Sequence, residues 1–372
     1  MSSLVRSNSL QKSLGNRFVM MEMLYRHGVV ALQLLQKHGE LYSKQFQQIS
    51  AFCDPSYAFI IYPPLVHALC QNSGRSMLLV VVITEWTNML LKWILMGDRP
   101  FWWVLENMKP RFEGDTIITQ FPLTCETGPG SPSGHVELQA ALNYAILHFL
   151  TTKVFRKAQF LSGLILWPAY LMLIIAVSLS RLYIAAHFPH QCVLGAFIGF
   201  TIAYCLVDID TTSWRLRHYL LLTLSLYLLA VLTKYSLLLS GTDPMRTLVL
   251  ARKHCANPAW IHIDTAPYFS MMRYLGFCAG LGFATSCTRY GITNRNIELP
   301  IRVVMAVATG IVGKLSENVV LPFRKADPIL FYSTAFAYHA MLAYLLFAFV
   351  PAVVLKIMGG ERKDGEDPRK TL

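Results

Sequence analysis

Long apolar stretches alternate with short polar ones along most of this chain. A helix needs about 20 mostly apolar residues to cross the hydrocarbon core of a bilayer, and nine stretches approach that length. The expected spans are 51–71, 77–97, 136–153, 160–180, 189–207, 218–240, 269–288, 301–316 and 329–356. The pattern therefore predicts an all-α fold, a polytopic membrane bundle of about nine transmembrane helices.

The same pattern divides the chain into three regions. Residues 1–50 lack a contiguous apolar block, so they do not resemble a cleaved signal peptide, and residues 18–37 are suited to an amphipathic surface helix. Residues 51–357 form the expected membrane domain. Residues 358–372 are charged and are expected to be a solvated tail.

Composition supports a membrane protein: 54% of the 372 residues are hydrophobic and the mean hydropathy is +0.42. The net charge is +12, but the basic residues are scattered, so no nucleic-acid partner is expected. Part of the excess belongs on the cytosolic face of the membrane. Cys125 and Cys255 fall in loops expected on the same side of the membrane, so a disulfide between them is possible.

Three polar islands interrupt the apolar pattern, and the first is "LKWILMGDRP". Lys92 and Arg99 are seven residues apart, close to two helical turns, so they are expected to share one helix face about 10 Å apart along the axis. Arg99 precedes Pro100, where a helix usually ends. A lysine inside an apolar helix is costly unless it reaches the interface or meets an anion. Taken alone, the pair also fits an ordinary basic membrane edge.

The second island is "GPGSPSGH", residues 128–135. Its glycines and prolines delay a helix until about Ser133, a residue type suited to capping a helix N-terminus. The free N–H groups of that terminus can bind an anion, and Gly134 lets an oxygen approach the main chain closely. His135 lies in the first turn and can exchange a proton near neutral pH. A flexible loop with a capping serine is the plainer alternative.

The third island is "SRLYIAAHFPHQ", residues 180–191. Arg181 and His187 can converge only if one helix ends near the arginine and another begins near the histidine. Pro189 suits the first turn of that second helix, and Gln191 follows His187 by one turn. His187 and His190 lack an evident third ligand, so neither a metal nor any other cofactor is expected.

Connectivity brings the three islands together. The second expected span ends at the first island, the third span leaves from the second, and the fourth and fifth meet at the third. All three islands therefore lie on one side of the membrane. We expect one lysine, two arginines, a helix N-terminus and two histidines to surround a single pocket.

Such a pocket suits phosphoryl transfer. Lys92, Arg99 and Arg181 supply charge and N–H donors for phosphate oxygens, and the islands lack a carboxylate cluster that would hold magnesium. One imidazole can attack phosphorus while the other protonates the leaving oxygen. Either histidine fits the nucleophile. We favour His187, because Gln191 can accept a hydrogen bond from one ring nitrogen and leave the other free, and we assign His135 as the general acid.

The islands resemble a known signature. Lys92-x6-Arg99-Pro100, Pro132-Ser133-Gly134-His135 and Ser180-Arg181-x5-His187 are similar to that of the type 2 phosphatidic acid phosphatase and vanadium haloperoxidase superfamily. "QFPLTCETGPGSPSGH", "SRLYIAAHFPHQ" and "PAWIHIDTAPY" resemble its glucose-6-phosphatase catalytic subunit family. The similarity runs from about Asp54 to the C-terminus. The wider superfamily usually has an aspartate where this chain has Gln191, and the glucose-6-phosphatase branch resembles this chain in the glutamine.

The resemblance implies roles for these residues. Lys92, Arg99 and Arg181 would bind the phosphate with help from Ser133 and Gly134, His135 would donate the proton, and His187 would be phosphorylated. It also implies hydrolysis of glucose 6-phosphate to glucose and phosphate, in support of gluconeogenesis and glycogenolysis. The family further implies nine helices in the endoplasmic reticulum membrane, a lumenal site, a cytosolic C-terminus and a sugar-phosphate transporter as a partner.

Sugar contacts and rival functions are less constrained by the sequence. Asp54 and Glu126 are candidate acceptors for glucose hydroxyls, His262 and Asp264 could line the opening, and Trp102 with Trp103 could stack on a sugar ring.

A lipid or diphosphate phosphatase of the same superfamily is the alternative enzyme. A sugar-phosphate transporter is the alternative from another class, because buried positive charge fits it too. Transport, however, does not require the two histidines.

Overall fold

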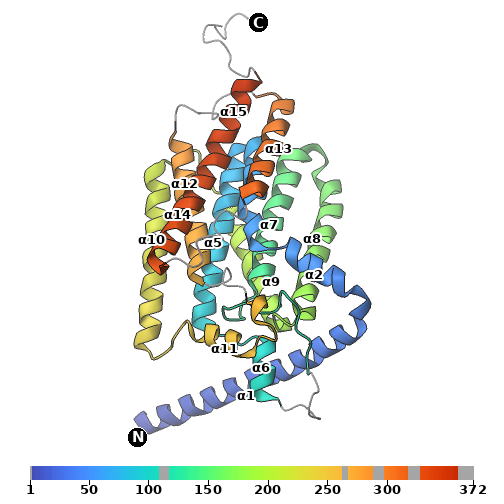
Figure 1. Cartoon of the computed structure of the whole chain (residues 1–372), viewed down its shortest axis with the longest axis vertical. Helices are drawn as coiled ribbons and strands as arrows, with labels where there is room; N and C mark the ends of the chain where they lie inside the picture. Colours follow the sequence, from blue (N-terminus) through green and yellow to red (C-terminus); the bar gives the residue numbers. More distant parts are fainter. Residues whose placement is uncertain (1, 109–116, 262–266, 288–296, 317–326, 359–372) are drawn as a thin grey trace, which may run out of the picture.

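A computed structural model describes residues 2–108, 117–261, 267–287, 297–316 and 327–358 (Figure 1). These residues are mostly helical and contain no β-strand. The helices are α1 (Ser2–His38), α2 (Ser43–Phe52), α3 (Pro55–Ile60), α4 (Tyr62–Leu69), α5 (Gln71–Leu95), α6 (Pro100–Asn107), α7 (Gly134–Phe149), α8 (Gln159–Tyr183), α9 (Pro189–Leu206), α10 (Leu216–Leu239), α11 (Arg246–His254), α12 (Pro267–Ser286), α13 (Leu299–Ser316), α14 (Pro328–Tyr344) and α15 (Val350–Ile357). The all-α prediction is confirmed.

Within the described residues, six helical stretches are long and apolar enough to cross a membrane. They are Gln71–Asn107, Arg156–Tyr183, Pro189–Leu206, Leu216–Leu239, Leu299–Ser316 and Ile329–Ile357. The other expected spans correspond to α3 with α4, to α7 and to α12, which are helical but are not among these six. The prediction of a membrane bundle holds, whereas the count of nine crossings is not confirmed.

The short helix α7 forms the centre of the bundle. Figure 1 shows α5 and α7 between α8 on one side and α10, α12 and α14 on the other. One buried apolar cluster joins α7 to α5, α10, α12 and α14, and a second joins it to α8 and α9. Because other helices surround α7, its side chains are almost all buried, and it can carry polar residues such as Glu137 and Gln139 in the interior.

Two helix crossings depend on glycines four residues apart. A Cβ added to Gly199 on α9 would lie 1.9 Å from the backbone oxygen of Glu137 on α7, and one added to Gly195 would lie 2.7 Å from that of Ser133. On α12, Cβ atoms at Gly276 and Gly280 would lie 2.7 and 2.2 Å from the backbone oxygens of Phe336 and Ala340 on α14. Small residues at this spacing let helix backbones approach closely in membranes. The first crossing holds the start of α9 against the start of α7.

The N-terminal helix α1 lies across one end of the bundle, and α15 ends at the other (Figure 1). On α1, the Tyr25 ring packs against Phe188 and Trp103, with centroids 4.8 and 5.2 Å away. The side-chain amide of Gln36, also on α1, donates to the backbone oxygen of Tyr183 at 2.7 Å. Residues 2–38 therefore cover the end of the bundle at which α8 gives way to α9. The tail from residue 359 onward lies outside the described residues.

Candidate active site

The first island contains a helix break. α5 ends at Leu95, Met96 is left-handed with φ 48°, and Arg99 precedes α6 in an extended conformation. The prediction that Lys92 and Arg99 share one helix face is wrong, because the helix does not continue between them. The turn is held instead by a hydrogen bond from the backbone N–H of Gly130 to the oxygen of Gly97, at 2.7 Å.

The second island ends as the sequence indicates. Ser133 is the N-cap residue of α7, which begins at Gly134 and carries His135 in its first turn. The Ser133 hydroxyl does not cap the helix; it is buried and has no hydrogen-bond partner in the described part of the chain. A Cβ on Gly134 would lie 3.4 Å from Nζ of Lys92. The lysine, the serine and the helix terminus are therefore neighbours.

The third island is the turn between α8 and α9. α8 ends at Tyr183, Ala185 is left-handed with φ 55°, and α9 begins at Pro189. Met96 and Ala185 are the only non-glycine residues with positive φ among those described, and this conformation costs about 1–3 kcal/mol. The break allows Arg181 and His187 to reach one pocket, as the sequence predicts.

Arg99 joins all three islands. Its Nε donates to the oxygen of Gly128 at 2.7 Å, its Nη2 to that of Pro129 at 3.1 Å and its Nη1 to that of Ala186 at 3.1 Å. Nη1 also lies 3.2 Å from Nε2 of His187. The side chain is fully buried, so these bonds replace water and fix the guanidinium between the second and third islands.

The carboxylate of Glu126 lies at the centre of the cationic side chains. Oε2 accepts from Nη2 of Arg99 at 2.8 Å and lies 4.0 Å from Nε2 of His187. Oε1 pairs with Nη2 of Arg181 and lies 3.5 Å from Nδ1 of His135. The two histidines thus approach different oxygens of one anion. We call the space enclosed by Arg99, Arg181, His135 and His187 the anion pocket.

The anion pocket has more hydrogen-bond donors and positive charge than the one carboxylate engages. Lys92 has no hydrogen bond or ion pair to any described residue, and Nε of Arg181 is buried without a partner. The hydroxyl of Ser133 is unpartnered as well, and the first N–H groups of a helix have no partner within it. These donors suit an anion with more oxygens and more charge than a carboxylate.

His187 is held by its Nδ1 atom. Nδ1 lies 2.8 Å from the oxygen of Gly130 and 3.3 Å from Oε1 of Gln191, so that it carries the proton and Nε2 has the lone pair. Gln191 in turn accepts from the N–H of Phe188 and donates to the oxygen of Asp98 at 2.7 Å. Gln191 therefore helps to orient His187 by fixing the neighbouring backbone at Phe188 and Asp98. The shorter contact with Nδ1 of His187 is made by the oxygen of Gly130.

Burial and charge set the protonation of two groups in the pocket. Burial, reinforced by the Arg99 guanidinium, lowers the pKa of His187 well below its ordinary value of 6.5. The ring is therefore neutral near pH 7. Burial alone would raise the pKa of Glu126, but the guanidinium groups of Arg181 and Arg99 outweigh it and hold that pKa well below its usual range.

Sequence reasoning missed one support of the pocket and left a second one open. Nη1 of Arg181 donates to the hydroxyl of Ser50 at 2.5 Å, near the end of α2 and outside the three islands. Cys125, next to Glu126, forms a disulfide with Cys255 after α11. The paired loop positions of the two cysteines pointed to the bridge, whereas no local signal pointed to Ser50.

The candidate sugar-binding residues differ in how far they are buried and in whether the structure describes them. Trp102 and Trp103 are buried; the Trp102 indole donates to Asp98 at 3.0 Å and the Trp103 ring packs on Tyr25, so neither is free to stack on a sugar. Asp54 is half-buried between α2 and α3. His262 and Asp264 lie outside the described residues.

Much of this sequence is shared with known proteins. The model of the PAP2 superfamily matches residues 73–215, the segment that carries all three islands, so the helices and the pocket define a membrane phosphatase fold of that superfamily. Glucose-6-phosphatase 2 of Homo sapiens is 36% identical over 353 residues, covering 91% of this chain and 98% of that protein. Glucose-6-phosphatase catalytic subunit 1 of Mus musculus is 34% identical over 355 residues, covering 92% and 98%.

Glucose-6-phosphatase 3 of Homo sapiens is 34% identical over 276 residues, which is 74% of this chain and 80% of that protein. The chain belongs to the glucose-6-phosphatase catalytic subunit family. No solved structure matches it.

Proposed function

We propose that this chain hydrolyses glucose 6-phosphate to glucose and inorganic phosphate through a phosphohistidine intermediate. One observation carries the proposal: a single carboxylate, that of Glu126, is held by Arg99 and Arg181 between His135 and His187. The pocket is therefore built around an anion. A phosphate has the additional oxygens that Lys92, Ser133 and the start of α7 can bind.

The first step transfers the phosphoryl group to His187. Phosphate displaces Glu126 from the arginines, and Arg99 turns its Nη1 donor from Nε2 of His187 to a phosphate oxygen. The Nε2 lone pair then attacks phosphorus, the P–O bond to the sugar breaks, and His135 gives a proton to the departing O6 oxygen. The arginines and Lys92 stabilise the charge on the equatorial oxygens, a preorganised electrostatic contribution.

The second step reverses these roles. His135, now neutral, takes a proton from water, the water oxygen attacks phosphorus, and the N–P bond to His187 breaks to release inorganic phosphate. Splitting the hydrolysis in this way is covalent catalysis. The Nδ1 contact with Gly130 holds the ring while Nε2 forms and breaks its bond, so one tautomer serves both steps.

Glu126 has a second role in this scheme. Once phosphate occupies the arginines, the displaced carboxylate lies at the edge of the pocket, where it accepts hydrogen bonds from sugar hydroxyls together with Asp54. Asp54 immediately precedes α3, which contacts α7, the helix that carries His135. Both residues therefore remain our candidates for glucose recognition.

The substrate is tested with the full-length protein in a neutral detergent. Phosphate release from glucose 6-phosphate and from phosphatidic acid is compared at equal concentrations, with His187→Ala as the blank. We expect release from the sugar phosphate to exceed release from the lipid. A preference for phosphatidic acid would overturn the substrate assignment, and equal release by His187→Ala would overturn the nucleophile.

We place the enzyme in the endoplasmic reticulum membrane with the pocket on the lumenal side and residues 358–372 in the cytosol. The family relationship and the opposite positions of α1 and α15 support this orientation. A sugar-phosphate transporter must then supply the substrate. In sealed microsomes, permeabilisation should increase hydrolysis of glucose 6-phosphate when that transporter is absent; full activity without permeabilisation would contradict a lumenal pocket.

A further inference from the structure

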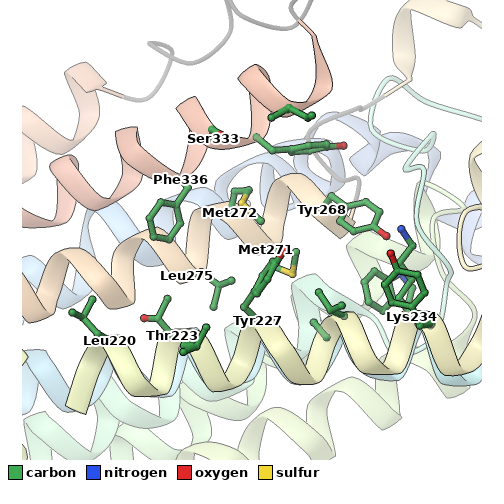
Figure 2. Close-up of a pocket in the computed structure, with 17 residues that line it drawn as sticks. Leu220, Thr223, Tyr227, Lys234, Tyr268, Met271, Met272, Leu275, Ser333 and Phe336 are labelled. Atoms are coloured by element: carbon green, nitrogen blue, oxygen red, sulfur yellow. The ribbon is translucent and has the colours of Figure 1, made fainter. Parts of the chain in front are cut away.

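A second cavity is lined by none of the four residues that enclose the anion pocket. It has a volume of about 660 Å³ and is bounded by α10, α12 and α14, with Trp93 of α5 in its wall (Figure 2). Figure 2 shows Leu220 at one end of the cavity and Lys234 with Tyr268 at the other. We call it the α10–α12–α14 groove.

The groove is long enough for one acyl chain. Its wall on α10 extends from Leu220 to Tyr235, and this separation corresponds to about 22 Å of helix. Half of a bilayer's hydrocarbon core is about 15 Å thick. A chain that enters the groove can therefore lie along α10 over the depth of one leaflet.

Most of the wall is apolar and adaptable. Leu224, Met271, Met272, Leu275 and Phe336 line the middle of the groove. Methionine is flexible and polarizable, so it fits irregular apolar ligands. The α10 wall is open outward, since Leu224 and Tyr227 keep 52% and 42% of their surface exposed. A lipid can enter from the surrounding bilayer without unfolding any helix.

The one charged side chain of the groove, Lys234, lies at one end beside Tyr268. Nζ of Lys234 lies 4.9 Å from the centroid of the Tyr268 ring, and Lys234 has no ion pair with any described residue. The Trp93 indole is buried 5.7 Å from the same ring, and its N–H has no hydrogen-bond partner among the residues that the structure describes. A cation and an unpartnered buried donor at the end of an apolar channel are complementary to an anionic headgroup.

We propose that the α10–α12–α14 groove binds one acyl chain of an anionic phospholipid, whose phosphate is held by Lys234. The chain lies against Met271, Met272 and Phe336, and the second chain remains in the bilayer outside α10. Charge complementarity favours an anionic over a zwitterionic lipid, because Lys234 is the one charged residue in the wall.

Trp93 provides the readout, because bromine atoms on an acyl chain quench a nearby indole. The full-length protein is placed in phosphatidylcholine nanodiscs that contain a minor fraction of brominated phosphatidylglycerol or of brominated phosphatidylcholine. The difference in emission between the protein and its Trp93→Phe variant isolates this indole. We expect brominated phosphatidylglycerol to quench the Trp93 emission several-fold more than brominated phosphatidylcholine does.

Three variants decide the assignment. Lys234→Gln should remove the preference, whereas Lys157→Gln, which neutralises an exposed lysine outside the groove, should keep it. His187→Ala should also keep it, because the groove does not use the anion pocket. Equal quenching by both lipids, or a preference that survives in Lys234→Gln, overturns the proposal. Stronger quenching by a brominated fatty acid than by phosphatidylglycerol would assign the groove to free acids instead.

Discussion

The anion pocket and the α10–α12–α14 groove share helix α5, since Lys92 borders the first and Trp93 the second. In the pocket, buried cations are fixed by backbone oxygens and by a carboxylate, so that Arg99 alone makes three bonds to main-chain oxygens. In the groove, the one cation lies over an aromatic ring between apolar walls. The pocket is held by many polar contacts and suits an anion with several oxygens, whereas the groove is mostly apolar and suits a flexible chain with one anionic group.

The two sites also differ in how much strained backbone surrounds them. Both non-glycine residues with positive φ among those described, Met96 and Ala185, border the anion pocket. A tight α7–α9 crossing lies beneath it, and a disulfide lies beside it. The groove has no such supports in the described residues, consistent with a site for a weakly specific lipid. Changes in the pocket should therefore affect hydrolysis strongly, and changes in the groove should not.

The largest effect is expected for Arg99→Ala. The guanidinium binds the developing charge and also joins the islands, so its loss should lower kcat/KM by about 10²–10³-fold, as for other preorganised donors. The control is Arg26→Ala on α1, whose partner is the exposed Glu22. Steady-state hydrolysis of glucose 6-phosphate measures both variants. Normal turnover by Arg99→Ala would count against the pocket.

A smaller effect, of opposite sign, is expected for Glu126→Gln. Removing the carboxylate charge removes the anion that competes for Arg99 and Arg181, so inorganic phosphate should inhibit about ten-fold more tightly, equivalent to about 1.4 kcal/mol. The inhibition constant for phosphate is the proper readout, because it does not depend on sugar contacts. Glu106→Gln, at a surface pair with Lys253, should leave it unchanged. Weaker inhibition of Glu126→Gln would show that Glu126 supports the phosphate site.

These expectations depend on contacts that the sequence reveals to different degrees. Helix periods, prolines and the order of the spans sufficed to bring Arg99, Ser133 and His187 to one side. The helix break after Leu95 was missed, because methionine is not a residue type that indicates a left-handed turn. The place of Glu126 was missed as well, because a pairing between a loop carboxylate and two distant arginines depends on tertiary structure.

The smallest effect concerns the helix crossing beneath the pocket. Gly199→Ala would press a methyl group against the backbone oxygen of Glu137 and force α7 and α9 apart. Overpacking of this kind costs about 1–3 kcal/mol, so the thermal midpoint should fall. Gly310→Ala on α13, where a Cβ meets nothing within 4 Å, should be neutral or slightly stabilising. The lipid preference of the groove should survive both changes, and an equal loss of stability in the two would contradict the tight crossing.

The central claim is that His187 takes up the phosphoryl group, and trapping tests it most directly. The full-length protein is mixed with glucose 6-phosphate labelled with ³²P, quenched in alkali, where phosphohistidine survives, and mapped by peptide. We predict label on the peptide that contains His187, none in His187→Ala, and label retained in His190→Ala. Label on His135 instead, or undiminished label in His187→Ala, would contradict the account.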